Sequence, residues 1–198
     1  NFIYFYWQFD KICYNLFVER SWYILMINID IDNCCNDFIQ KFIYYLNGVQ
    51  TETCFGLDDF TDYSLSRSTG FYNGYLETLF FRNNNFYEQL RPLVNCVETI
   101  QELVTCGNEV RFVTAIRYDV VQARLDFIKE YFPFIDTDNQ LIITNNKESI
   151  YADIVIEDCT DNLKNVNKDC DYILFDQPWN KDFEIRKEDR IHRAFDWY

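Results

Sequence analysis

The sequence predicts an α/β protein built on a parallel sheet. Five short, nearly continuous apolar runs recur along its 198 residues, and runs of this kind are typical of strands covered on both faces. Segments with helical spacing separate the early runs, and strands that alternate with helices form parallel sheets. The runs lie at residues 24–29, 110–113, 141–144, 154–156 and 172–175.

The chain between the first and second runs has helical patterns. Residues 37–46 place their apolar side chains on one face of a helix, and the Asn-Gly pair that follows predicts its end. Two more helical patterns lie at 75–81 and 93–104. After the second run, apolar spacing predicts a helix over 119–131. The last two runs are so close in sequence that a helix between them must be short.

These elements divide the chain into a core and an insertion. Residues 26–36 and 108–198 form the predicted core, and residues 37–107 form a small helical cap inserted after the first strand. Residues 1–25 hold ten aromatic side chains without a clear amphipathic period, and Met26 is the only methionine. A purine-rich ribosome-binding sequence can be encoded a few codons before Met26. We therefore interpret residues 1–25 as a translated leader that is not native, with a genuine N-terminal helix as the alternative.

Charge and composition exclude several classes of partner. Thirty-two acidic against eighteen basic residues give a net charge of −14, which repels nucleic acid polymers and anionic membrane surfaces. None of the five glycines falls in a dinucleotide-binding or P-loop motif. The eight cysteines form no C-x-x-C pair and His192 is the only histidine, so a Cys/His zinc site is not supported. Reduced thiols and the lack of a secretory signal predict a cytoplasmic protein.

Polar side chains follow four of the predicted strands at their carboxyl ends, where ligands sit in open parallel sheets. Each has a simpler explanation by itself, such as a helix cap or a solvated turn, but four in this order rarely arise by chance. Two carboxylates at positions i and i+2 also repel each other unless a cation lies between them or one is protonated. The residues are Asp30 and Asp32 after the first strand, Thr114 after the second, Lys147 after the third, and Glu157 and Asp158 after the fourth.

In this order the motifs resemble those of the haloacid dehalogenase-like (HAD) phosphatases. The closer resemblance is to the cytosolic type C 5′(3′)-deoxyribonucleotidases of that superfamily, from about Met26 to the C-terminus, and residues 36–38, 60–63 and 86–87 also carry it. It implies a three-layer, Rossmann-like sheet in the strand order 3-2-1-4-5 and a small cap that closes over the substrate. The family's final helix carries a tryptophan, matched by Trp197, which implies that the chain stops inside that helix.

The resemblance also implies a Mg²⁺-dependent phosphomonoester hydrolase. Asp30 is the implied nucleophile, which forms an aspartyl-phosphate, and Asp32 is the implied general acid and base. The Asp30 carboxylate, the Asp32 backbone carbonyl and Asp158 are the implied Mg²⁺ ligands. Glu157 is implied to tune the metal without binding it directly.

Other residues are assigned to the substrate by the same resemblance. Thr114, the backbone N–H of Ala115 and Lys147 are implied to bind the phosphoryl oxygens. Phe86 and Tyr87 match an aromatic pair that stacks on a pyrimidine base. Two core aromatics in an aromatic-rich chain remain the alternative for this pair.

The sequence departs from the family pattern at three places. Asn33 and Cys34 stand where the family has Gly-Val, Ala115 stands where a serine is common, and Glu157 replaces the first of two aspartates. Cys34 and Cys159 flank the acidic motifs, and we interpret both as small buried hydrophobic side chains rather than as redox or metal groups.

Together these features predict a 5′(3′)-deoxyribonucleotidase that hydrolyses a deoxynucleoside monophosphate. A HAD phosphatase for another small phosphomonoester, such as a sugar phosphate, is the first alternative. A nucleotide-binding module without turnover is the second. The predicted partner is a small nucleoside monophosphate, not a nucleic acid polymer or a membrane, and a homodimer is retained as one alternative for the oligomeric state.

Overall fold

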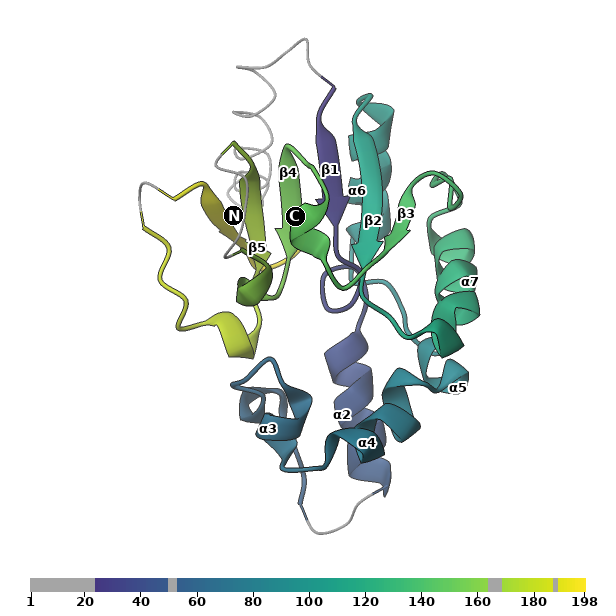
Figure 1. Ribbon diagram of the computed structural model, residues 1–198, viewed down its shortest axis with the longest axis vertical. Coiled ribbons are helices and arrows are strands. Elements are labelled where there is room, and N and C mark those ends of the chain that lie inside the picture. Colours follow the sequence, from purple (N-terminus) through teal and green to yellow (C-terminus); the bar gives the residue numbers. More distant parts are fainter. Residues whose placement is uncertain (1–23, 50–52, 164–168, 187–188) are drawn as a thin grey trace, which may run out of the picture.

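The computed structural model places a six-stranded parallel sheet at the centre of the described residues (Figure 1). Hydrogen-bonded neighbours follow the order β3-β2-β1-β4-β5-β6, which confirms the predicted α/β class and contains the predicted order 3-2-1-4-5. The strands are β1 (Met26–Ile29), β2 (Glu109–Thr114), β3 (Leu141–Ile143), β4 (Ile154–Glu157), β5 (Asp171–Phe175) and β6 (Ile191–Ala194). The structure describes residues 24–49, 53–163, 169–186 and 189–198, so the interpretation of residues 1–25 lies almost entirely outside them.

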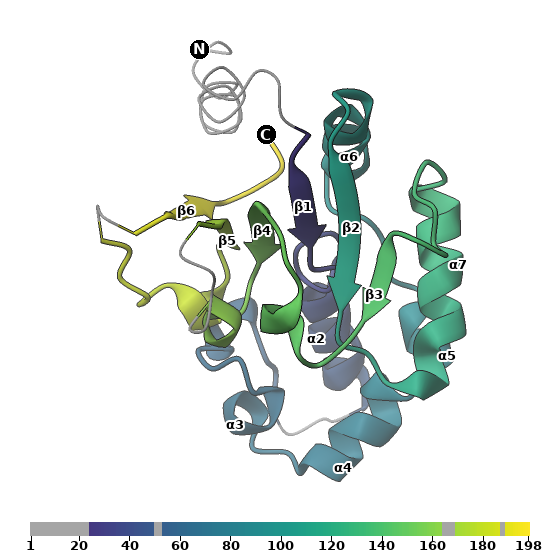
Figure 2. The ribbon, with the colours of Figure 1, turned by 45° about the horizontal axis from the view of Figure 1, so that its top comes forward.

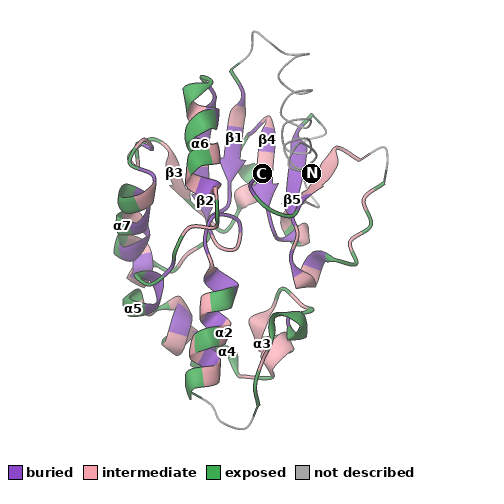
Figure 3. Ribbon diagram, turned by 180° about the vertical axis from the view of Figure 1, so that it is seen from behind, coloured by how far each residue is buried: buried purple, intermediate pink, exposed green. Residues whose placement is uncertain are grey.

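The segment between β1 and β2 is helical, as the sequence predicts. Figure 1 shows α3, α4 and most of α2 beyond the carboxyl ends of the strands, whereas α6 lies against the sheet beside β2 (Figure 3). The last helix of the predicted insertion is therefore part of the layer that covers the sheet. The elements are α2 (Phe38–Val49), η1 (Leu57–Asp59), α3 (Leu65–Thr69), α4 (Asn73–Leu76), the π-helix η2 (Glu77–Phe81), α5 (Asn84–Tyr87) and α6 (Cys96–Thr105).

Two helix boundaries differ from the prediction because of contacts made elsewhere. Helix α2 continues past Asn47, whose side-chain amide bonds both backbone groups of Phe55 at 2.9 Å instead of ending the helix. Helix α6 begins three residues later than the predicted start at residue 93. A backbone bridge between Asn36 and Pro92 holds that stretch extended, and the Leu93 N–H donates to the Cys35 carbonyl at 2.8 Å.

The remaining helical elements are short, except for α7. The turn η3 (Tyr118–Val120) leads into α7 (Val121–Tyr131), which fills the predicted helix between β2 and β3. Within the described residues, the connections β3–β4 and β4–β5 contain only the 3₁₀ turns η4 (Lys147–Ser149) and η5 (Thr160–Leu163). Figure 2 shows the longer helices α6 and α7 near β2 and β3, whereas only short turns connect β3 to β4 and β4 to β5 within the described residues. This asymmetric cover of the sheet follows from the close spacing of the last strands in the sequence.

The C-terminal segment corrects the prediction of a final helix around Trp197. Residues 191–194 form the edge strand β6, which pairs with β5 from Tyr172↔Ile191 to Phe175↔Ala194. Residues 195–198 are not helical. The indole of Trp197 is buried, lies 5.6 Å from the Phe175 ring and donates through Nε1 to the Cys34 carbonyl at 2.6 Å. Strand β6 escapes sequence analysis because edge strands tolerate polar residues, so its Ile-His-Arg-Ala sequence has no continuous apolar run.

One apolar core extends from the sheet into the helices beyond it. Ile27 and Ile29 of β1 belong to it, and so does Phe42 of α2, whose ring lies 4.5 Å from Phe80 and 5.9 Å from Phe60. Because these rings are almost fully buried, they hold the capping helices at a fixed place over the carboxyl edge of the sheet. No helix in the described part of the chain is long and apolar enough to cross a membrane.

Candidate active site

The predicted site residues meet at the carboxyl edge of three neighbouring strands. Strand β1 lies between β2 and β4, with Ile29 paired to Phe112 on one side and Ile156 on the other. The Asp30 N–H donates to the Ile156 carbonyl at 2.9 Å and extends the ladder by one residue. This register places Asp30 beside the last residue of β4, as the order of the strands in the sequence predicts.

Lys147 joins two buried carboxylates at this edge. Its Nζ lies 2.7 Å from Asp30 Oδ1 and 3.0 Å from Glu157 Oε2. Burial alone would lower the pKa of Lys147, but the two carboxylates outweigh it and raise the pKa above its usual range. Burial, and then the charge of Glu157, raise the pKa of Asp30 to about 8 against the lowering effect of Lys147.

Glu157 has a more direct role than the resemblance implies. Besides the Lys147 contact, its Oε1 accepts the Cys159 N–H at 3.3 Å, and the side chain is only 2% exposed. These contacts are those of an anchor that holds the ammonium of Lys147 against Asp30. Sequence analysis expected Glu157 to tune the metal without binding it, and that role stays a prediction.

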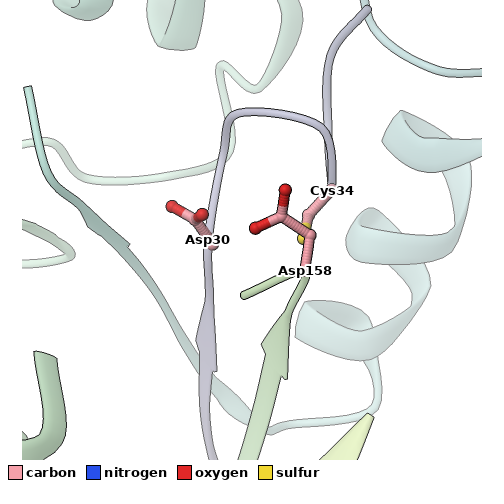
Figure 4. A group of neighbouring side chains, drawn as sticks. All are labelled: Asp30, Cys34 and Asp158. Carbon is pink, nitrogen blue, oxygen red and sulfur yellow. The ribbon is translucent and has the colours of Figure 1, made fainter. Parts of the chain in front are cut away.

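Asp158 and Asp30 form the candidate metal site. Their carboxylate oxygens and the Cys34 sulfur lie within 4.8 Å of one another, and the Asp158 carboxylate points toward Asp30 (Figure 4). Asp158 Oδ2 accepts from Asn33 Nδ2 at 3.1 Å, whereas its Oδ1 is buried with no hydrogen-bond partner among the described residues. Burial, followed by the charges of Glu157 and Asp30, raises the pKa of Asp158.

The charge balance of this cluster fits a divalent cation. Three buried carboxylates, those of Asp30, Glu157 and Asp158, are close to the single ammonium of Lys147. An unpaired buried charge is costly, and an oxygen-rich donor set with a free carboxylate oxygen suits Mg²⁺. The donors present therefore fit the predicted cofactor.

Asn33 explains how the chain tolerates the loss of a family glycine in the turn after β1. Its φ is +62°, in the left-handed region that favours glycine, and asparagine is among the residues that adopt it most readily. The side chain also spans the turn, because its Oδ1 accepts the Ile39 N–H at 2.8 Å. The Asn33 side chain thus fixes the turn, and its amide nitrogen at the same time contacts Asp158.

Asp32 is paired with Arg124, a residue that sequence analysis missed. Arg124 Nη2 lies 2.6 and 2.7 Å from the two Asp32 oxygens, and Asn36 Nδ2 donates to Oδ1 at 2.9 Å. The guanidinium is 1% exposed and lies 5.4 Å from the centre of the Tyr87 ring. The available signal was an arginine four residues before Ile128 on a helix whose other buried residues are apolar.

Thr114 ends β2 and Ala115 follows it, and the sequence predicts both as phosphate-binding groups. The Thr114 hydroxyl is buried at the end of β2 with no hydrogen-bond partner in the part of the chain that the structure describes. Ala115 lines a cavity of about 370 Å³ that also borders Asp32. The Thr114 hydroxyl is thus without a partner among the described residues, one residue before the cavity wall, and its phosphate-binding role stays a prediction.

The cavity lies between the sheet edge and the capping helices, and its volume falls in the range of about 300–1,000 Å³ typical of small-molecule sites. The predicted aromatic pair divides here. Tyr87 lines the cavity, but Phe86 does not, because it is buried edge-to-face against Phe38 and Phe80 at 5.2 and 5.3 Å. The aromatic side chains on the wall are Phe38, Tyr63, Phe81, Tyr87 and Trp179.

The fold is that of solved HAD-like hydrolases. A HAD family hydrolase from Deinococcus radiodurans R1 aligns with a TM-score of 0.52 at 11% identity, over 78% of this chain and 84% of that one. A HAD hydrolase of family IA, variant 3, from Entamoeba histolytica HM-1:IMSS aligns with a TM-score of 0.50 at 12% identity, over 77% and 84%. At these identities the two structures show a common fold.

Sequence comparison identifies the family within that class. The family model of the 5′ nucleotidase, deoxy (pyrimidine), cytosolic type C proteins matches residues 24–197, so the chain belongs to this family. A 5′(3′)-deoxyribonucleotidase of Clostridium acetobutylicum is 31% identical over 87% of this chain and 90% of its own length. Another, of Bacillus subtilis strain 168, is 29% identical over 87% and 94%. The resemblance seen in the sequence is confirmed.

Proposed function

We propose that this chain is a Mg²⁺-dependent 5′(3′)-deoxyribonucleotidase, which hydrolyses a deoxynucleoside monophosphate to a nucleoside and phosphate. Its family and the relatives named above support the activity. The observation that carries the proposal is the contact of Lys147 with Asp30 and Glu157, because it places a buried cation beside the one carboxylate that the motif order assigns as nucleophile.

The two carboxylates of the motif are separated by their partners. Asp30 belongs to the cluster of Lys147 and Asp158, whereas Asp32 faces the cavity and is held by Arg124. Different surroundings are what two chemically identical groups need in order to act separately as nucleophile and as acid and base. The two carboxylates therefore have different surroundings, and a cation bound between Asp30 and Asp158 would return Asp30, whose pKa is raised by burial, to the ionised form that a nucleophile needs.

In the first step, an Asp30 oxygen attacks phosphorus, the ester P–O bond breaks, and Asp32 gives a proton to the leaving oxygen. In the second step, Asp32 removes a proton from water, whose oxygen attacks the acyl-phosphate. The bond from phosphorus to Asp30 then breaks, and phosphate is released. Thr114 and Lys147 bind the phosphoryl oxygens as their charge changes.

Asp30 and Asp158 would hold Mg²⁺ through their carboxylates, with the Asp32 carbonyl as the third proposed protein ligand. When bound, the ion offsets the repulsion between a carboxylate and an anionic phosphate. Lys147 does not supply enough positive charge to offset this repulsion, since its charge is already shared by two carboxylates.

A nucleoside rather than a sugar is the proposed leaving group because the cavity wall is aromatic. Phe38, Tyr87 and Phe81 come from the capping segment and Trp179 from the core, so rings surround the space next to Asp32. Stacking of a base on such rings is worth about 1–3 kcal/mol. A sugar phosphate would leave this surface largely without a partner.

Phosphate release from a panel of deoxynucleoside, ribonucleoside and sugar phosphates tests the proposal. We expect the nucleotides to be hydrolysed fastest, activity to vanish with a chelator and to return with Mg²⁺. Asp30→Asn should lower turnover by at least about 10³-fold, because an amide cannot form the acyl-phosphate. Asp126→Asn, on the exposed side of α7, is the matched control and should retain activity.

Each alternative gives a different result in the same panel. Equal rates on sugar phosphates and nucleotides would favour the general small-molecule phosphatase. Nucleotide binding without phosphate release from any substrate would favour the module without turnover. Full activity after exhaustive chelation would contradict the metal requirement.

A further inference from the structure

Cys34 lies at the candidate metal site, at a position where the resemblance seen in the sequence places a valine. Its side chain is fully buried, and its sulfur lies within 4.8 Å of carboxylate oxygens of both Asp30 and Asp158. Figure 4 shows the thiol on the turn after β1, with the Asp158 carboxylate between it and Asp30. Sequence analysis interpreted Cys34 as a small hydrophobic residue, and burial agrees with that. The two adjacent carboxylates do not agree with that interpretation, because they are not what a hydrophobic side chain packs against.

The turn that carries Cys34 is held from both sides. The Cys34 carbonyl accepts the Trp197 indole N–H at 2.6 Å, and the next N–H, that of Cys35, donates to the Ile31 carbonyl at 2.8 Å. Asn33 joins the same turn to Asp158. These hydrogen bonds hold the turn in place, so the fold keeps the sulfur beside the two carboxylates.

An independent observation indicates that the space between these three side chains takes a cation. Asp158 is 1% exposed, and its Oδ1 has no hydrogen-bond partner within the described residues, although the carboxylate is directed into the cluster (Figure 4). The nearby ammonium of Lys147 is already bonded to Asp30 and Glu157. A buried carboxylate oxygen without a partner is costly, and a metal ion removes that cost.

We infer that Cys34 is a ligand of this site together with Asp30 and Asp158, so that the site binds thiophilic divalent cations such as Zn²⁺ and Co²⁺ through a sulfur–metal bond. The inference rests on the proposed function only in that Mg²⁺ and these cations would share Asp30 and Asp158. Mg²⁺ takes oxygen ligands alone, whereas Zn²⁺ and Co²⁺ accept a thiolate with carboxylates.

The geometry and the proton balance fit this coordination. With a Zn–S bond of about 2.3 Å and Zn–O bonds of about 2.0–2.2 Å, two ligand atoms of one tetrahedral ion are about 3.4–3.7 Å apart. The observed limit of 4.8 Å therefore requires the side chains to close by about 1 Å when the ion binds. Binding converts the Cys34 thiol to a metal thiolate, and its proton is released to solvent. Three protein ligands leave one tetrahedral position for water or a phosphate oxygen.

Spectroscopy of the Co²⁺-loaded protein tests the inference without relying on activity. The exposed thiols Cys54 and Cys106, and Cys13, which lies outside the described residues, are first replaced by serine so that they do not bind the probe. The metal-free full chain is then titrated with Co²⁺. We expect one near-ultraviolet thiolate-to-Co²⁺ charge-transfer band that saturates at one ion per chain.

Cys34→Val, the residue typical of the family, should abolish the band and weaken Zn²⁺ binding in calorimetry by at least about 10- to 100-fold, as expected when a ligand is lost. Cys159→Val is the matched control, because Cys159 is equally buried and follows Asp158 directly. It should keep the band. Cys34→Ser replaces the sulfur with oxygen, and it should bind Co²⁺ without the band.

The outcomes separate this inference from the proposed function. Co²⁺ binding with no charge-transfer band in the parent protein would overturn the role of Cys34, whatever the stability of its variants, and would leave the Mg²⁺ site intact. A band that survives in Cys34→Val would overturn it as well. A band that is lost only with Cys34, in a protein that releases no phosphate from any substrate, would support the inference and reject the proposed nucleotidase.

Discussion

Replacing Lys147 with methionine should expose how strongly the acidic cluster depends on one ammonium. Lys147 is 11% exposed, and its Nζ lies 2.7 Å from Asp30 and 3.0 Å from Glu157. Methionine keeps most of the aliphatic chain but leaves two buried carboxylates facing each other. Removing one member of a buried ion pair costs about 3–5 kcal/mol, so we expect the free energy of unfolding to fall by about that amount near pH 8.5, where Asp30 is largely ionised, without divalent cations.

The pH dependence of this loss has a definite sign. The pKa of Asp30 is already raised to about 8 in the folded protein, so between pH 3.8 and about 8 the folded state binds protons that the unfolded state does not. Stability therefore falls as the pH rises through that window. Without the lowering effect of Lys147 the pKa of Asp30 rises further, so the deficit of Lys147→Met should be largest near pH 8.5 and smaller near pH 5.5.

Urea unfolding of the chelator-treated protein at these two pH values measures the effect. Lys147→Met/Glu157→Gln should recover about 1–3 kcal/mol relative to Lys147→Met, because the second change removes the carboxylate that repels Asp30. Lys41→Met is the control, since its 3.8 Å contact with Asp37 is more open to solvent and is worth about 0–1 kcal/mol. A deficit below about 1 kcal/mol, or one that grows as the pH falls, would refute the reasoning.

Three further predictions concern side chains around the cavity and the C-terminus. Arg124→Met should lower kcat/KM for a nucleoside monophosphate by about 10- to 100-fold, because Asp32 loses the side chain that positions it. The loss for an activated aryl phosphate should be smaller, because its good leaving group needs less protonation. Equal losses on both substrates would contradict this role of Arg124. Tyr87→Ala should lower kcat/KM for nucleotides by about 5- to 150-fold and leave kcat/KM for sugar phosphates nearly unchanged. Phe86→Ala should instead lower the free energy of unfolding by about 3–5 kcal/mol. Trp197→Phe should lower the free energy of unfolding by about 1–3 kcal/mol in urea unfolding, because the buried Cys34 carbonyl loses the indole N–H that donates to it; an unchanged midpoint would rule this out.

The sequence by itself determined the parallel sheet and the edge on which the site lies. Five strands were predictable because each is a local apolar run, which is typical of strands in a covered parallel sheet. Every residue of β5 is buried, whereas β3, at the edge of the sheet, is only partly buried. The convergence of Asp30, Thr114 and Asp158 was predictable for the same reason. Parallel strands end at one edge, so residues that follow neighbouring strands must meet there.

Only the tertiary structure decided which partners those residues have. Arg124 and Asp32 are 92 positions apart, and nothing in the local sequence of either shows that they pair. Phe86 and Tyr87 are adjacent in sequence and equally buried, yet Tyr87 lines the cavity, whereas Phe86 packs edge-to-face against Phe38 and Phe80. The strand before Trp197 was likewise invisible, because its polar residues are stabilised by the neighbouring β5 rather than by a pattern of their own. Periodicity reports which face of an element is buried, whereas ion pairs, cavity walls and edge strands depend on contacts between distant segments that form only when the chain is folded.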